Sequence, residues 1–235
     1  MKKLLLLIPL LAVALNSCTI DDGPYEWPKY DKLVKAITDG DWSMEYQYDN
    51  QKRLVKTMES YFGEVYTTII SYSNNKITAH YQGSPDYFQD YTYQYILDNN
   101  GYMIKVFFGG EGDGSRSFTY ANGYLATGFG DENDMFPKLR EFVWSNGNLI
   151  KEKYDNIVRQ EYTYTNYPND LNLDIGDLGF PLKFKGTYSK NLPATMTDGD
   201  EIAYYSYTFD TDGNLTAITR TKGEYVPSIT YFTYY

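Results

Sequence analysis

A repeat of about 23 residues runs through most of the chain and constrains its fold more than any other feature. Its clearest pair is KLVK at residues 32–35 against RLVK at residues 53–56. Further copies are marked by apolar anchors spaced 21 to 26 residues apart, at Leu33, Leu54, Ile77, Met103, Leu125, Leu149, Leu171, Leu192 and Leu215. Because nothing long interrupts the series, we expect one repeat domain over residues 31–235.

Each copy has the pattern of a β-hairpin. Before most anchors, two aromatic or apolar residues flank a polar one and precede a polar turn, as in FTY at 118–120 before Asn122-Gly123. Asn-Gly between alternating residues is the strongest short-range hairpin signal, because both residues tolerate positive φ angles. Two strands per copy predict an all-β antiparallel meander of about 16 strands.

We predict that this meander curls into a water-soluble barrel or half-barrel, since so many twisted strands rarely stay open. In YTYQY at 91–95 the tyrosines share one face, and Thr92 and Gln94 share the other, as in a sheet with one packed and one wet face. A transmembrane barrel is the rival. It would need an apolar outer band, and the aromatic end ITYFTYY at 229–235 is its main support.

The first 17 residues are predicted to be an export signal, with a basic start at Lys2 and Lys3 and a mostly apolar run over 4–15. The following LNSC at 15–18 resembles the lipobox of bacterial lipoproteins. That resemblance implies cleavage before Cys18 and its acylation, so that residues 18–30 form a lipidated tether to a bilayer. Several acyl chains together anchor durably. An ordinary secretory signal is the alternative.

The run YTFDTDGNLT at 207–216 resembles the YD repeat of the Rhs family. With the lipobox, the series of such hairpins is similar to a family of Bacteroidetes lipoproteins of unknown function with a porin-like fold. Most copies depart from the YD pattern, as QKR does at 51–53. Thr19 lacks the aspartate of inner-membrane retention, and Asp21-Asp22 resembles the acidic tag of surface-displayed members. The resemblance therefore implies the outer membrane, with display at the cell surface as a further expectation.

The charge of the chain limits its partners. Signal cleavage would remove two lysines and leave 19 basic against 31 acidic residues, so the net charge would move from −10 to −12. Such a charge argues against nucleic acid and anionic lipid surfaces.

Few residues suit catalysis, and we expect neither an enzyme nor a cofactor. His80 is the only histidine and lies in a strand-like run, and Cys18 is assigned to lipid. The run of Asp210, Asp212 and Asn214 resembles the start of a calcium loop, but Thr221 stands where the loop needs glutamate, and a hairpin turn explains the same residues. The acidic loop with Asp170, Asp174 and Asp177 is a similar calcium candidate, and a solvated connection explains it equally well. The glycine-rich run 109–114 lacks the Lys-Ser/Thr pair and the helix of a phosphate-binding loop.

Aromatic side chains are the remaining candidates for function. Flat rings beside amide and carboxylate groups suit sugar faces, which makes Trp42 and Trp144, and also Trp27, candidate ligand-binding residues. The simpler interpretation places Trp144 and most tyrosines in the core. We therefore expect a non-enzymatic lipoprotein that binds a glycan or protein ligand. The alternatives are a structural or assembly component of an envelope complex and a carboxylate-based glycosidase.

Overall fold

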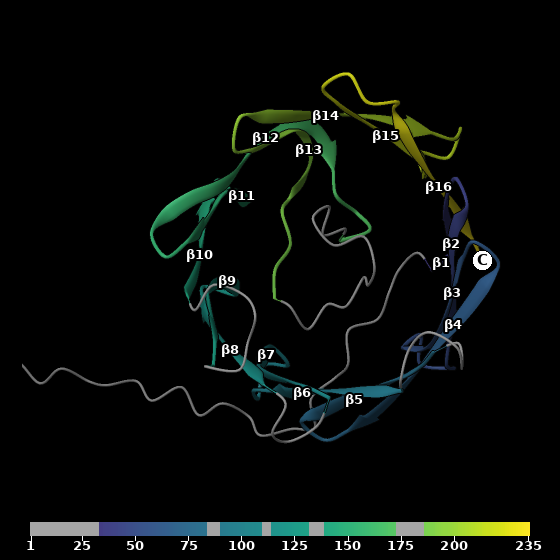
Figure 1. Cartoon of the computed structure of the whole chain (residues 1–235), viewed down its shortest axis with the longest axis vertical. Helices are drawn as coiled ribbons and strands as arrows, with labels where there is room; N and C mark the ends of the chain where they lie inside the picture. Colours follow the sequence, from purple (N-terminus) through teal and green to yellow (C-terminus); the bar gives the residue numbers. More distant parts are fainter. Residues whose placement is uncertain (1–32, 84–89, 110–113, 132–138, 173–185) are drawn as a thin grey trace, which may run out of the picture.

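The computed structural model describes residues 33–83, 90–109, 114–131, 139–172 and 186–235, whose strands form one closed antiparallel barrel (Figure 1). Each strand pairs with its neighbours in chain order, and β1 pairs with β16 to close the ring. The 16 strands are β1 (Val34–Asp39), β2 (Trp42–Tyr48), β3 (Leu54–Tyr61), β4 (Glu64–Ser73), β5 (Lys76–Gln82), β6 (Tyr91–Leu97), β7 (Met103–Phe108), β8 (Ser115–Ala121), β9 (Tyr124–Gly130), β10 (Leu139–Ser145), β11 (Asn148–Tyr154), β12 (Ile157–Pro168), β13 (Asn191–Asp198), β14 (Glu201–Phe209), β15 (Leu215–Lys222) and β16 (Ser228–Tyr234). The predicted all-β meander is confirmed, and the barrel is closed rather than a half-barrel.

Eight of the nine predicted anchors lie at the start of an odd-numbered strand or directly before it. Leu171 is the exception, because it lies in the connection between β12 and β13. There β12 extends over 12 residues and its pairing with β13 shifts register between Tyr164 and Pro168. The repeat at Leu171 therefore starts no strand, and the prediction for that copy was wrong.

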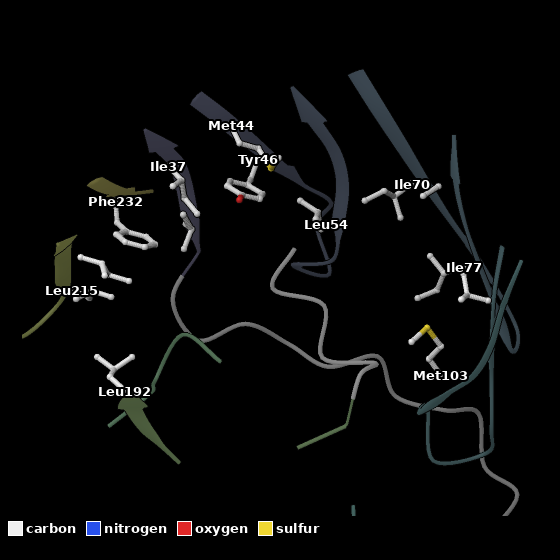
Figure 2. Packing of buried hydrophobic residues seen from close by; sticks show 14 of the residues in the cluster. Ile37, Met44, Tyr46, Leu54, Ile70, Ile77, Met103, Leu192, Leu215 and Phe232 are labelled. Atoms are coloured by element: carbon white, nitrogen blue, oxygen red, sulfur yellow. The ribbon is translucent and has the colours of Figure 1, made fainter. Parts of the chain in front are cut away.

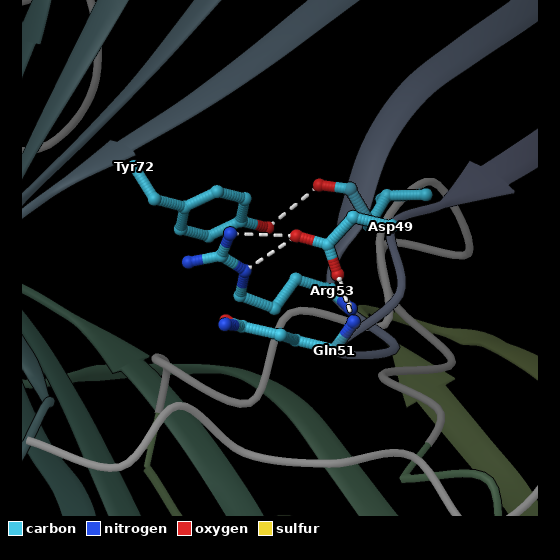
Figure 3. A network of polar contacts seen from close by, with 5 residues as sticks. Asp49, Gln51, Arg53 and Tyr72 are labelled. Atoms are coloured by element: carbon cyan, nitrogen blue, oxygen red, sulfur yellow. Dashed lines mark hydrogen bonds and ion pairs between the residues drawn. The ribbon is translucent and has the colours of Figure 1, made fainter.

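The turns after even-numbered strands, together with residues 33 and 235, define what we call the anchor end of the barrel. Asn122 and Gly123 both have positive φ, at 53° and 82°, as do Asn146 and Gly147, as the Asn-Gly signal predicted. Three longer turns share another arrangement, in which one aspartate oxygen accepts two backbone N–H groups. In the first of them Asp49 Oδ1 accepts from Gln51 (2.8 Å) and Arg53 (2.9 Å) (Figure 3). The aspartates at 98 and 210 bind their turns in the same way.

The apolar core lies on the inner face of the wall. Ile37, Met44, Leu54 and Phe232 are buried there with Tyr46 (Figure 2). The opposite face of the same strands is largely polar: Thr119 and Thr127 share a hydrogen bond of 2.7 Å across β8 and β9, as do Thr163 and Thr195 across β12 and β13. Strand alternation thus sends most aromatic side chains inward, while the outer face carries hydroxyl, amide and charged side chains together with exposed apolar ones such as Phe129, Tyr204 and Tyr231.

No helix in the described part of the chain is long and apolar enough to cross a membrane.

Residues 186–190 cross the inside of the barrel at the anchor end (Figure 1). The N–H of Thr187 donates to the carbonyl of Gly123, and the N–H of Lys190 donates to the carbonyl of Gly147, both at 2.8 Å. Gly186 is needed there, because a Cβ at this position would lie 2.7 Å from the Tyr120 ring and 2.8 Å from the Gly123 carbonyl oxygen. This segment therefore narrows the opening of the barrel at the anchor end. We call the opposite end, which is formed by the turns after odd-numbered strands, the far end.

Candidate binding site on the inner wall

The number of strands directs attention to the interior. Barrels of about eight strands can be filled by their own side chains, whereas barrels of 16 to 18 strands enclose more space than their walls fill. Inward-facing side chains of this barrel therefore adjoin space that other atoms must occupy.

Trp42 begins β2 at the far end and packs against the core. Its indole Nε1 donates to Glu59 Oε1 at 2.6 Å, a charge-assisted hydrogen bond across the β2–β3 hairpin. Glu59 lies directly between buried Met44 and Tyr66 in the sheet register, so its carboxylate also faces inward. Trp42 itself pairs with Tyr61, which places a second ring beside this carboxylate.

A ladder of tyrosines continues the inner wall across β5 and β6. The rings of Tyr81 and Tyr91 stack at 4.5 Å with an interplanar angle of 14°, and Tyr93 meets each of them at 5.2 Å. Tyr91 remains 37% exposed. Burial, followed by the proximity of Tyr93 and of the Glu59 charge, raises the pKa of Tyr91 to about 12. The ladder thus offers flat, neutral rings close to a carboxylate.

The inward-facing cations lie on other strands. Arg140 of β10 forms an ion pair with Glu152 at 2.8 Å, and Glu152 also accepts a hydrogen bond from the Tyr162 hydroxyl at 2.9 Å. Near the far end, Lys222 of β15 forms an ion pair with Glu201 at 2.5 Å. Within the described residues of β1 to β6, the register turns no Lys, Arg or His side chain inward. The wall of β1 to β6 is therefore aromatic and acidic, and its one nearby cation described above, Arg53 of the β2–β3 turn, lies 4.8 Å from the Tyr72 ring and is paired with Asp49.

The structure places the two candidate tryptophans at opposite ends of the barrel. Trp144 is near the anchor end, where its Nε1 donates to the carbonyl of Leu125 at 2.7 Å and its ring lies 4.7 Å from that of Tyr124. Trp42 and Trp144 are therefore not brought together, and only Trp42 adjoins an inward carboxylate. Trp27 and the lipidation candidate Cys18 lie outside the described residues.

The predicted calcium candidates form a turn. Asp210 Oδ1 accepts the N–H groups of Asp212 (3.0 Å) and Asn214 (2.8 Å), while Oδ2 accepts from the Asn214 amide (2.8 Å). Among the described residues no group of three His, Cys, Asp or Glu side chains could hold a metal ion. Asp174 and Asp177 of the acidic loop lie outside the described ranges, as do residues 110–113 of the glycine-rich run.

His80 faces the outside of the barrel. Its Nδ1 lies 3.0 Å from Thr92 Oγ1, its cross-strand partner, and its Nε2 lies 3.8 Å from Asp90 Oδ2. Cross-strand side-chain pairs of this kind stabilise a sheet. The arrangement is that of a surface pair between β5 and β6.

A small cavity of about 260 Å³ lies at the anchor end, beneath the β12–β13 connection. Its lining is mainly apolar and includes Tyr167, Leu171, Leu192, Phe209 and Leu215. Leu171, which starts no strand, is thus used to line this cavity.

The sequence predicted Trp42 but missed Glu59, Tyr61 and Tyr66. A signal for them was present, because the tight turn at Phe62-Gly63 fixes the register of the β3–β4 hairpin and sets Glu59 opposite Tyr66. Without an assignment of that turn, Glu59 could not be distinguished from the other strand carboxylates.

Comparisons with known proteins show the fold. No protein-family model matches the chain, and no curated protein matches it either. Among solved structures, the barrel is similar to a porin-like protein from Bacteroides uniformis. The TM-score is 0.68 at 16% sequence identity, and the match covers 90% of this chain and 100% of that chain. The porin-like architecture expected from the sequence resemblance is confirmed. At this identity the likeness shows the fold alone.

Proposed function

We propose that this protein is a non-enzymatic, lipid-anchored barrel of the outer membrane that binds a glycan or protein ligand on its inner wall. Acylated Cys18 would attach it to the bilayer, and the barrel itself would stand in water. Display at the cell surface is part of this proposal, and nucleic acid is not an expected partner. The porin-like fold supports a non-enzymatic role at the outer membrane.

The observation that carries the proposal is the kind of side chain that the strands turn outward. A transmembrane barrel presents an apolar band to lipid and a polar interior, and a Lys or Arg at the middle of its lipid face costs about 2 to 4 kcal/mol. Here the outer face carries the ion pair of Lys151 with Glu161, at 2.5 Å, and the hydrogen-bonded Thr pairs described above. Most aromatic rings lie inside, and Phe129, Tyr204 and Tyr231 are exposed on the outer face. The outer face is therefore mixed, with charged and hydroxyl side chains between the apolar ones, and this interruption of an apolar band supports a wall that faces water.

Ligand binding would use the rings of Trp42, Tyr81 and Tyr91 with the adjacent carboxylate of Glu59. Aromatic faces beside a few polar groups are the common composition of ligand sites. A glycan array probed with residues 19–235 tests the proposal. Binding that is lost in a Trp42→Ala, Tyr91→Ala double variant supports it, whereas binding unchanged in that folded variant would place the ligand elsewhere.

The lipid anchor has a separate test. Cys18→Ala removes the chain's only cysteine, so the variant should accumulate as precursor or leave the membrane fraction and should not incorporate labelled fatty acid. A variant that still incorporates the label would exclude the lipobox assignment. The wild-type chain processed in parallel is the control.

A role in an envelope assembly is the second candidate, favoured by exposed apolar side chains on the far-end turns. Phe62 is 70% exposed and has a φ of 49°, and Val226 is 92% exposed beside Tyr225. Exposed apolar groups of this kind occur at protein interfaces, and non-Gly residues rarely adopt positive φ. A Phe62→Ser, Val226→Ser double variant that loses a co-purifying envelope protein but keeps its glycan signal would favour this role.

A further inference from the structure

Glu59 is a carboxylate without a cationic partner among the residues that the structure describes. Its side chain is partly buried, and its one hydrogen bond among the described residues is the one it accepts from Trp42 Nε1 at 2.6 Å. Two inward acids on other strands differ, since Glu152 pairs with Arg140 and Glu201 pairs with Lys222, whereas Asp39 of β1 accepts a hydrogen bond from Thr230 at 3.1 Å. A partly buried charge without a counterion is costly, because desolvation is not offset by an opposite charge. A cation supplied from outside the chain would offset it.

Aromatic rings surround this carboxylate on the inner wall. Trp42 donates to it, Tyr61 is two residues along the same strand, and Tyr66 is its direct cross-strand partner. The charge of Glu59 also contributes, after burial as the main cause, to raising the pKa of the Tyr46 and Tyr91 phenols. Ring faces attract cations electrostatically, most strongly where water is displaced.

A second observation points to an incomplete site. The hydroxyl of Tyr46 makes no hydrogen bond to the described part of the chain, although Tyr46 is only 1% exposed. Other inward rings near the ends of even-numbered strands do have partners, such as Tyr72, which donates to the Leu54 carbonyl at 2.7 Å (Figure 3). A buried hydroxyl without a partner is uncommon in native structures.

We propose that the inner wall of β2 to β6 binds an organic ammonium ion, with the charge of the ligand against the Glu59 carboxylate and its alkyl groups against the rings of Trp42, Tyr61 and Tyr66. The absence of inward cations from these strands makes this part of the wall attractive to a positive ligand. An aromatic enclosure with a carboxylate recognises quaternary and protonated amines, whereas neutral sugars need no charge. The inference rests on the proposed function only in placing a ligand on the inner wall.

Choline and 3,3-dimethylbutan-1-ol, its neutral isostere, distinguish charge from shape. Calorimetric titration of the mature chain at low salt should show choline binding at least about tenfold more tightly than the alcohol. Glu59→Gln should weaken choline binding at least about tenfold and leave the weak binding of the alcohol unchanged. Glu224→Gln, an exposed acid in the β15–β16 loop, should bind like the wild type. Thermal melting of each variant establishes that it is folded.

Equal affinity for both probes, unchanged choline binding in folded Glu59→Gln, or no choline binding by the wild type at concentrations on the order of 100 mM would overturn the inference. If Glu59→Gln is unfolded, Trp42→Phe replaces it, because that variant keeps a ring but removes the N–H donor. It should alter choline binding if the site is real, and unaltered binding would contradict it. A glycan-array result is independent of these titrations, so either proposal can fail without the other.

Discussion

Trp144 donates its indole N–H to the carbonyl oxygen of Leu125 at 2.7 Å, and the same contact recurs around the barrel. In each case an inward aromatic near the end of an even-numbered strand bonds to the anchor that begins the preceding strand. The further members are Tyr72 to Leu54 (2.7 Å), Tyr120 to Met103 (2.9 Å), Tyr164 to Leu149 (2.5 Å) and Tyr234 to Leu215 (2.6 Å). The aromatic and the anchor therefore repeat together in the sequence because they bind each other across a hairpin.

Truncation of these rings should destabilise the barrel. Trp144→Ala removes a partly buried ring and leaves the Leu125 carbonyl without its donor, so we expect a loss of roughly 3 kcal/mol, at the low end for large core rings. Tyr120→Ala and Tyr207→Ala should behave similarly. Urea unfolding measures the loss. Tyr204→Ala, on the outer face and 57% exposed, is the matched control and should stay within about 0.5 kcal/mol. A Trp144→Ala variant as stable as this control would assign Trp144 to recognition.

Acid should weaken the Asp49 turn. Partial burial acts to raise the pKa of Asp49, but hydrogen bonds from Arg53 and Gln51 and the charge of Arg53 outweigh it and hold the pKa below its ordinary value. Its contribution to stability is therefore present above the unfolded pKa of about 3.9 and is lost as pH falls through the folded pKa. Wild type should exceed Asp49→Asn in stability at neutral pH, and the two should converge below about pH 4. A difference in stability between the two proteins that stays constant with pH would contradict this prediction.

Alkaline pH should destabilise the barrel through its inward phenols. Burial, followed by neighbouring acidic groups, raises the pKa of Tyr91 and of Tyr234 to about 12. Because the unfolded phenols ionise near pH 10, the contribution is complete below about pH 10 and is lost as pH rises toward the folded pKa of about 12. Ultraviolet absorbance of the phenolate, followed with urea midpoints, should show late ionisation coupled to falling stability. Full ionisation near pH 10 with the barrel still folded would refute it.

The crossing segment at the anchor end can be tested with one methyl group. Gly186→Ala would place a Cβ 2.7 Å from the Tyr120 ring at a φ of +90°, so we expect a clear loss of stability from clash and backbone strain together. Gly199 also has a positive φ, +61°, but a Cβ there meets nothing within 4 Å. Gly199→Ala should therefore cost only the strain, about 1 kcal/mol. The melting temperatures of the Gly186→Ala and Gly199→Ala variants separate the cost of the clash from the cost of the strain. Equal melting temperatures would show that residues 186–190 shift to accommodate the methyl group without cost.

The architecture could be predicted from local signals because each hairpin carries its own register. The Asn-Gly turn at 122–123 fixes the pairing of β8 with β9, and the inward ring of Tyr120 follows from strand alternation. Closure could not be predicted in the same way. It depends on the pairing of Ile37 with Phe232 across almost the whole chain, which no local pattern encodes. Leu171 was misassigned because an apolar residue at the right interval serves equally well in a loop that lines a cavity.

The candidate site was only partly predictable. Trp42 stood out by residue type, but its role depends on Glu59, 17 residues later in another strand. Glu59 resembles every other strand carboxylate in the sequence, and its distinction is that it accepts the Trp42 N–H while no cation faces it across the described hairpins. That property belongs to the assembled wall.

The most direct test of this account is the behaviour of residues 19–235 in buffer without detergent. Sedimentation velocity with far-UV circular dichroism should find a folded β-protein of discrete size, because ion pairs and hydroxyl groups interrupt the outer wall while most rings lie inside. The same β-spectrum obtained only in detergent or lipid, with aggregation in its absence, would contradict the account and favour a barrel that spans the membrane.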